Sequence, residues 1–567
     1  MTTAYLHSFS VDINGPLDEG IEIRIFRLEV DTTLGMASTF ALYFHDNNGT
    51  LADDSTFELG KAIKIKTKGM GETSEALIFE GEITSVEPHF IADGEGTQFV
   101  VRGYDKTHRL TKGTQRRVFK DATHSDIVKE ILGDYLLSPD AESTTPKYDH
   151  VFQDNISDRD FIEGLARING FTFGFADGKV YFKKPAGDTT VTMTWKEELL
   201  EFHPRINAVG MVDKVIVTGW NPVEKKEITG QATSSNSQPT SVTDSTKGIK
   251  VAKDFGASTY QAYIPDVKDP SAAEKIAQAL LNTFNSAFVE AEGVVTGTTK
   301  LVAGTKLEVK EIGDRFNGTY FITSARHVIE ENQYRVYFSS EGAKAHMLSD
   351  MILGAAGAYR ENGGGGWRGV VPAIVTNIKD DENDIVRVKV KYPWMDNELE
   401  SHWARLAGVG AGQSASGIHW LPQVNDEVLV AFENGNINRP YVLGGLWNGT
   451  DKPPQVIGDT LKSDKVNIRT IQTPAGNKIV MYDASGEEKI EIIDAKGVTS
   501  ITLDGGGKMV DIKTSGDLTI KADGSVTIEG NGITIKSDST LDLEGSGASK
   551  LKTSAALTIE GSTVAIN

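Results

Sequence analysis

The stretch MVDIKTSGDLTIKADGSVTIEGNGITIKSDSTLDLEG, from Met509 to Gly545, decides how the end of this chain folds. In it, pairs of aliphatic residues separated by one polar residue recur between Gly, Asp, Ser and Lys. The first members of successive pairs, from Val510 to Leu541, are spaced by eight, eight, seven and eight residues. A fixed short period of this kind indicates a repetitive β architecture.

The repeat extends on both sides of that stretch, from about Lys489 to the last residue. Earlier pairs are Ile490 with Ile492 and Ile501 with Leu503, and the last pair is Val564 with Ile566. We assign the core of the repeat to six pairs: Val510 and Ile512, Leu518 and Ile520, Val526 and Ile528, Ile533 and Ile535, Leu541 and Leu543, and Leu557 and Ile559.

Each repeat has too little apolar surface to fold alone. Its two aliphatic residues gain at most a few kcal/mol, at about 0.8 kcal/mol per buried CH₂, whereas ordering the chain costs about 1 to 2 kcal/mol per residue. Eight residues are also too few for one turn of a single-chain solenoid. We therefore predict a β-prism in which three chains wind about one axis, with an irregular monomeric β-solenoid as the alternative.

A narrow aliphatic core also agrees with the composition of this region. Beyond Trp447 the only aromatic residue is Tyr482, and no histidine follows His419. Bulky rings would not stack along a thin axis. The missing histidines, and the absence of cysteine from the chain, also exclude a tip that binds metal through those residues.

Composition bounds the rest of the chain. Its 567 residues predict several domains, and 39% hydrophobic residues without a long apolar run predict no membrane anchor. A net charge of −21 disfavours nucleic acid as a partner, because such binding depends on Lys and Arg. The segment Met1 to Asp12 lacks the pattern of a secretory signal, so export by the general route is not expected.

Before the repeat, the hydrophobic pattern predicts β-rich domains with inserted helices. Period-two runs predict one barrel-like region from Tyr5 to Arg102 and a second small barrel from Lys306 to Phe338. Helices are expected at Ser125–Leu132, after a capping Ser157, and at about Ser271–Phe288, with a hairpin turn at Asp177-Gly178 and an exposed loop at Thr229–Gly248.

A third barrel is expected nearer the repeat. The runs at 385–392 and 427–432 alternate with Gly and Pro turns, which suits a small closed barrel of the oligonucleotide-binding (OB) type. The predicted domains are a hub at 1–362, a Gly-rich linker at 363–369, an OB-fold barrel at 370–450, a connector at 451–488 and the spike at 489–567.

Two groups of motifs resemble a known family. The run from Arg102 to Gly113, with Gly103, Tyr104, Asp105, His108, Arg109 and Leu110, resembles a signature in the first domain of phage tail hubs and VgrG proteins. The block from Val371 to Trp447, including Pro393-Trp394 and Gly444-Gly445-Leu446-Trp447, resembles the small barrel of the same family. The residue pattern of this block resembles extracellular contractile injection systems and phage baseplates more than type VI secretion spikes.

The resemblance implies a hub and spike fused in one chain. Such a protein adapts a six-fold inner tube, built of an Hcp-like protein, to a three-fold needle that punctures a target envelope when a sheath contracts. The implied partners are two more copies of the chain, the tube, baseplate proteins and, in some systems, effector cargo. Assembly is expected in the bacterial cytoplasm and action outside the cell. No cofactor is implied.

The end of the repeat should bind a further protein. A blunt end of exposed strands is prone to improper pairing. We therefore expect a tip protein of the PAAR-repeat type to bind at Ser562, Thr563, Val564, Ala565, Ile566 and Asn567.

Catalytic patterns are weak, so an enzyme is not expected. Residues 410–415 meet only the loose form of a dinucleotide fingerprint, residues 504–509 favour a hairpin over a phosphate loop, and His108 has no nucleophile at a telling spacing. Two other functions remain open: an adhesive or carbohydrate-binding β-helix as in tail fibres, and a nucleic-acid-binding barrel.

Overall fold

The computed structural model describes residues 9–92, 97–185, 189–235, 246–256, 258–264, 267–341, 369–379, 381, 385–395 and 399–566. The chain divides into two compact units, Met1–Asp451 and Lys452–Asn567. The glycine run predicted as a linker lies outside the described residues, apart from Gly369.

A ten-stranded sheet dominates the first unit. Its order is β1 (Phe9–Ile13), β4 (Ala62–Thr67), β5 (Ala76–His89), β6 (Gln98–Tyr104), β3 (Thr39–His45), β2 (Ile25–Thr33), β20 (Ser324–Glu330), β21 (Gln333–Ser340), β17 (Val289–Thr296) and β13 (Leu199–Ile206). Strands from the two predicted hub barrels are therefore joined in one sheet, through the antiparallel pairing of β2 with β20.

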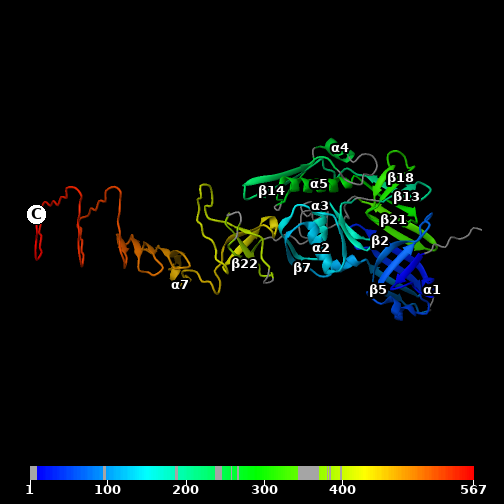
Figure 1. Ribbon diagram of the computed structural model, residues 1–567, viewed down its shortest axis with the longest axis horizontal. Coiled ribbons are helices and arrows are strands. Elements are labelled where there is room, and N and C mark those ends of the chain that lie inside the picture. The colour runs from blue at the N-terminus through cyan, green and yellow to red at the C-terminus, as the bar shows by residue number, and fades with distance from the viewer. Residues whose placement is uncertain are drawn as a thin grey trace, which may run out of the picture. The chain divides into compact units, whose positions relative to one another are not determined.

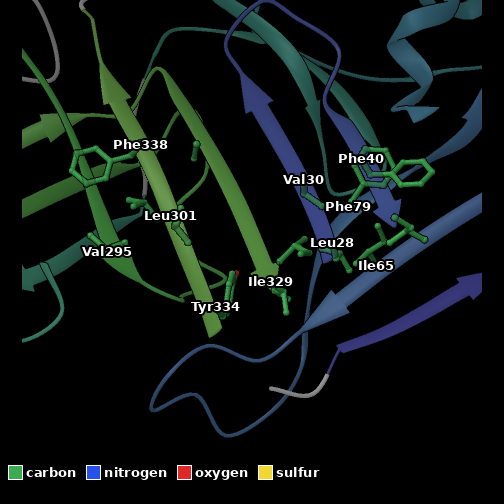
Figure 2. Packing of buried hydrophobic residues seen from close by; sticks show 14 of the residues in the cluster. Leu28, Val30, Phe40, Ile65, Phe79, Val295, Leu301, Ile329, Tyr334 and Phe338 are labelled. Carbon is green, nitrogen blue, oxygen red and sulfur yellow. The ribbon is translucent and has the colours of Figure 1, made fainter. Parts of the chain in front are cut away.

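One apolar core lies along this sheet. Leu28 on β2 is paired with Ile329 on β20, and both are buried (Figure 2). Phe40 and Phe79 pack at 5.0 Å between ring centroids on one side of that junction, and Phe338 lies on the other. The alternating runs of the sequence thus supply one buried face each, as a half-buried sheet requires.

The helices form where local signals place them. In α2 (His124–Asp134), Thr123 and Asp126 form a reciprocal capping box, and α3 (Asp158–Asn169) begins after Ser157, whose hydroxyl accepts from the backbone N–H of Asp160. The third helix, α5 (Pro270–Ser286), has Pro at its start. The three predicted helices are confirmed, each within two residues at its start. The hairpin at Asp177-Gly178 is confirmed between β10 (Thr172–Ala176) and β11 (Lys179–Lys183), a sheet that β8 (Ser138–Ala141) completes.

A small α/β layer surrounds α5. Figure 1 shows α5 beside β14 (Lys214–Asn221), which pairs with β15 (Lys226–Ala232) and β16 (Thr259–Tyr263). The prediction of a loop throughout 229–248 is wrong at both ends: β15 continues to Ala232, and α4 (Thr246–Asp254) begins before Gly248. Residues of low hydrophobicity form a strand here because Gly230 lets β15 approach the backbone of α5, which covers it. Residues 236–245 lie outside the description.

Two further pairings complete the hub. One sheet contains β12 (Thr190–Thr194), β18 (Lys306–Lys310) and β19 (Gly318–Phe321), and a two-stranded sheet contains β7 (Gln115–Ala122) and β9 (Tyr148–Ile156).

The predicted third barrel is confirmed as a closed barrel of β22 (Val370–Asn377), β23 (Arg387–Lys391), β24 (Ala404–Leu406), β26 (Pro440–Gly445) and β25 (Glu427–Phe432). Its interior holds the inward members of each alternating run, such as Val388, Val390, Val428 and Val430. Phe152 of β9 packs into the same cluster, so the hub contributes to the barrel's core. The mainly β fold class is confirmed.

Candidate functional site

In the second unit, a short helix α7 (Ile457–Thr460) and a two-stranded hairpin of β27 (Leu461–Lys462) and β28 (Lys465–Val466) precede an antiparallel meander of five strands. They are β29 (Ile468–Gln472), β30 (Lys478–Tyr482), β31 (Lys489–Ile493), β32 (Ser500–Asp504) and β33 (Met509–Lys513), in sequence order. Polar turns join them: the Asp494 carboxylate, for example, accepts from the backbone N–H of Thr499 at 2.7 Å. That hydrogen bond lowers the pKa of Asp494. The hairpin predicted at 504–509 is confirmed.

Two continuous rows of side chains cross one face of this meander. Directly paired residues, and residues two apart on one strand, project to the same face. The first row is Ile471, Ile479, Ile492, Ile501 and Ile512. The second row is Arg469, Met481, Ile490, Leu503 and Val510. We call this surface the aliphatic face.

The aliphatic face is uncovered in the single chain. Ile492 is 47% exposed and Val510 is 66% exposed. Ile471, Ile479, Ile492 and Ile501 line an open groove of about 420 Å³. The other face carries polar residues such as Glu491, which pairs with Lys489 at 2.8 Å. A sheet that exposes a continuous apolar face to water is incomplete as a folded unit.

Beyond Lys513 the chain runs on without forming secondary structure of its own. Among described residues 514–566 no strand or helix occurs, and no backbone N–H donates to a backbone carbonyl. The predicted core residues there are all at least half exposed, from 53% at Leu541 to 82% at Leu543. They are Leu518, Ile520, Val526, Ile528, Ile533, Ile535, Leu541, Leu543, Leu557 and Ile559. Residues 514–566 therefore leave their apolar side chains exposed and their backbone groups without backbone partners.

The residues predicted to bind a tip protein share this state. Residues 562–566 are exposed, with Val564 at 50% and Ile566 at 87%, and Asn567 lies outside the described residues.

Sequence reasoning missed the beginning of the aliphatic face. Ile471, Ile479 and Met481 belong to it, but they fall in 451–488, which was predicted to be a connector. The signal was present in Ile479-x-Met481, the same spacing as in the repeat. It was hidden because Arg469 takes the apolar position in the neighbouring strand.

The family signature lies in the hub, where it forms a close-packed corner. A Cβ on Gly103 would lie 1.9 Å from the carbonyl oxygen of Glu82, so only glycine fits there. The Asp105 carboxylate accepts from the backbone N–H groups of Ser38 and Thr107. Leu110 is fully buried, whereas Tyr104 is 44% exposed.

His108 and Arg109 both bind one buried carboxylate, that of Glu82 on β5. The His108 Nε2 lies 3.2 Å and the Arg109 Nε 3.1 Å from Glu82 Oε2. Burial alone would raise the pKa of Glu82, but the hydrogen bonds and charges of Arg109 and His108 hold it below its usual value. This geometry anchors the segment after β6 to the sheet. Glu82 was not among the predicted residues, since no spacing links it to the signature.

The remaining polar side chains of the described residues form no cluster of the kind that binds a metal ion. Within them, no group of three or more His, Asp or Glu side chains is placed to hold a metal ion. None of their helices combines the length and the apolar character that crossing a membrane requires. Residues 410–415 lie in the loop between β24 and β25.

Two family models match segments of the first unit. Residues 8–331 match a family model described as the Alg8 N-terminal domain, and residues 371–447 match one described as the type VI secretion system/phage-baseplate injector OB domain.

Similar sequences occur in Vibrio cholerae serotype O1. The chain is 26% identical over 200 residues to the type VI secretion system spike protein VgrG3, covering 34% of this chain and 20% of that protein. It is 22% identical over 406 residues to the actin cross-linking toxin VgrG1, covering 67% of this chain and 36% of that protein. The chain thus spans about a fifth to a third of the length of these relatives.

One solved structure shows a similar fold. A chain of the half-lidded Francisella PdpA–VgrG complex superposes with a TM-score of 0.53 at 9% identity, covering 91% of this chain and 89% of that chain.

Proposed function

The chain belongs to the family of the Alg8 N-terminal domain and is a VgrG-like spike protein with a structural spike and hub role, and from this premise we propose that three copies form the central needle of a contractile injection system. In this proposal the hub adapts a six-fold inner tube to the three-fold needle. The needle punctures the target envelope when the sheath contracts.

The proposal rests on the exposed aliphatic side chains and unpaired backbone of residues 514–566. Each eight-residue repeat exposes two aliphatic side chains, whose full burial would contribute about 3 to 6 kcal/mol. Fixing eight residues costs about 8 to 16 kcal/mol in chain entropy. Other copies supply what one chain lacks, namely apolar surface to cover these side chains and backbone groups to pair with its own.

Stiffness is the property that this arrangement would provide. Interlocked strands with continuous hydrogen bonding transmit force along the axis, and no step of this action needs bond chemistry. We therefore propose a mechanical and not an enzymatic role. The proposed parts keep the predicted bounds: hub 1–362, linker 363–369, OB barrel 370–450, connector 451–488 and spike 489–567.

Light scattering during size-exclusion chromatography tests the central claim. We expect the purified chain to elute at about three times its 61.4 kDa mass. A single copy in which amides of 514–566 are protected from hydrogen exchange would refute the proposal, because the repeat would then be ordered alone.

Further partners follow from the same assembly. We propose a PAAR-type tip protein at residues 562–567, an Hcp-like tube and baseplate proteins at the hub, and effector cargo as an optional passenger. Assembly would take place in the bacterial cytoplasm and action outside the cell. Deleting residues 562–567 should release the tip protein from purified particles while the trimer persists, whereas a retained tip would contradict this docking site.

A further inference from the structure

From Leu518 to Ile559, the residue that follows each pair of the repeat alternates in charge. The earlier pair, Val510 and Ile512, stands outside this alternation: Lys513 follows it and pairs with Asp511 of the same strand. After the pairs at 518–520, 526–528, 533–535 and 541–543 come Lys521, Glu529, Lys536 and Glu544. Eight residues beyond Leu541, the weaker pair Ser549 and Leu551 continues the period, and eight residues further comes the pair at 557–559. These two are followed by Lys552 and Glu560. We call each pair with its following residue a rung, and the six charged residues the flank.

The flank charges have no partner within their own chain. All six are exposed, and no ion pair forms among described residues 514–566. The meander before them behaves differently: there Lys489 is the cross-strand neighbour of Asp504, and it also pairs with Glu491. In the meander, whose strands are hydrogen-bonded within one chain, opposite charges therefore lie beside each other, whereas the flank charges have no such neighbour in their own chain.

The aliphatic pairs alone leave the register of copies unspecified. Val526 with Ile528 and Ile533 with Ile535 present nearly the same shape, so sliding one copy by a whole rung would cover the same apolar surface. Strands whose faces are alike along their length are prone to such slippage. Something else in the sequence must choose one register.

We propose that the alternating flank sets the register of this spike, by placing each rung of one copy beside the next rung of a neighbouring copy. The inference rests on the proposed trimer, and the partner surface is a second copy of this chain. With an offset of one rung, Lys521 lies beside Glu529, Glu529 beside Lys536, and so on to Lys552 beside Glu560. Every flank contact then joins opposite charges.

Even offsets place like charges together, and an offset of three rungs makes only three opposite-charge contacts instead of five. With no offset, each flank residue meets its own counterpart, and with an offset of two rungs Lys521 meets Lys536 and Glu529 meets Glu544. Like charges directly opposite on neighbouring strands are destabilising, and opposite charges are stabilising. Such pairs act mainly by excluding wrong arrangements, since exposed ion pairs add little affinity.

A second position supports the same offset. The residue between the members of each pair is Thr519, Thr527, Thr534 and Thr558 in four of the rungs, and Asp542 and Lys550 in the other two. The two charged ones stand on consecutive rungs and have opposite signs. A one-rung offset brings Asp542 beside Lys550.

Disulfide trapping tests the offset directly, because the chain contains no cysteine. Neighbouring positions on paired strands bring Cβ atoms within the range that a disulfide needs. Under oxidation, Lys521→Cys/Glu529→Cys should give covalent dimers and trimers on a denaturing gel. The single Lys521→Cys variant and the Lys521→Cys/Lys536→Cys pair should stay monomeric there.

Each alternative result has a distinct meaning. Efficient cross-linking of the single variant would show zero offset, and that of the 521/536 pair an offset of two; either would overturn the inference while leaving the trimer intact. A monomeric wild-type protein by light scattering would instead overturn the proposed function.

Charge exchange provides an independent test. Changing Lys521, Lys536 and Lys552 together to Glu makes the flank uniformly acidic, so the melting temperature should fall and added salt should recover part of the loss. Changing Glu529, Glu544 and Glu560 to Lys in the same chain restores alternation and should restore the wild-type melting temperature. If the sixfold exchange melts no higher than the threefold one, the flank does not set the register.

Discussion

Replacing Ile528 with Asp should abolish the trimer. Ile528 is 67% exposed in the single chain, so about two thirds of its surface remains to be covered by other copies. At about 1.5 to 3 kcal/mol for a fully buried aliphatic side chain, this is about 1 to 2 kcal/mol per copy and about 3 to 6 kcal/mol per trimer. The three carboxylates would also meet at the axis without cationic partners, which costs several kcal/mol more for each ion.

The matched control is Thr527→Asp, one residue earlier. Its side chain projects to the opposite face of the same rung, where a carboxylate stays in water, so this variant should remain trimeric. Light scattering and thermal melting of both variants give the comparison, and lowering the pH should partly restore trimers of the Ile528 variant as its carboxyl groups become neutral. A trimeric Ile528→Asp protein with a wild-type melting temperature would refute the axial placement of this residue.

Three further predictions concern separate parts of the chain. Gly103→Ala should lower the free energy of unfolding by about 1 to 3 kcal/mol in a denaturant titration, because its Cβ would lie 1.9 Å from a carbonyl oxygen, whereas Gly133→Ala, with no atom within 4 Å, should not. Burial lowers the pKa of His124 from 6.5 to about 4, so the unfolded chain takes up the proton first as pH falls. Stability should therefore be lost between pH 6.5 and 4, by about 3 kcal/mol at 1.36 kcal/mol per pKa unit, and the His124→Phe variant should lose less over that range; equal losses would contradict the buried neutral imidazole. Ile492→Asp should weaken trimers although Ile492 is already 47% exposed in one chain, and an unchanged mass and melting temperature would mean that the aliphatic face stays in water.

Local signals explain which elements the sequence could predict. Ser157 and its helix, the Asp177-Gly178 hairpin and the strand β25 each depend on residues within one short window, and all were found in place. The aliphatic pairs of the repeat were recognisable because their period is nearly constant. In these cases the interactions that decide the structure join residues that are close in sequence.

Contacts between distant segments explain what the sequence could not predict. The single ten-stranded sheet depends on the pairing of Leu28 with Ile329, and no sequence pattern near either residue predicts that pairing. Glu82 becomes the anchor of His108 and Arg109 only when β5 pairs with β6 across a register shift. The start of the aliphatic face was missed for a similar reason, since the place of Ile479 depends on the strands paired with it.

The two units of the chain therefore differ in how their apolar surface is covered. The hub and barrel cover their apolar faces within one chain, as the buried Leu28 and Val430 show, so they can fold before any copy is met. Residues 514–566 leave Ile520 and the other residues of the aliphatic pairs exposed, and they form no hydrogen bond between backbone groups. In the proposed trimer, their ordering would depend on the concentration of copies. Folded hubs that hold three tails close together would raise that local concentration. In the proposed assembly, the spike would then be the last part to form, and the hubs would promote its formation by bringing three tails together.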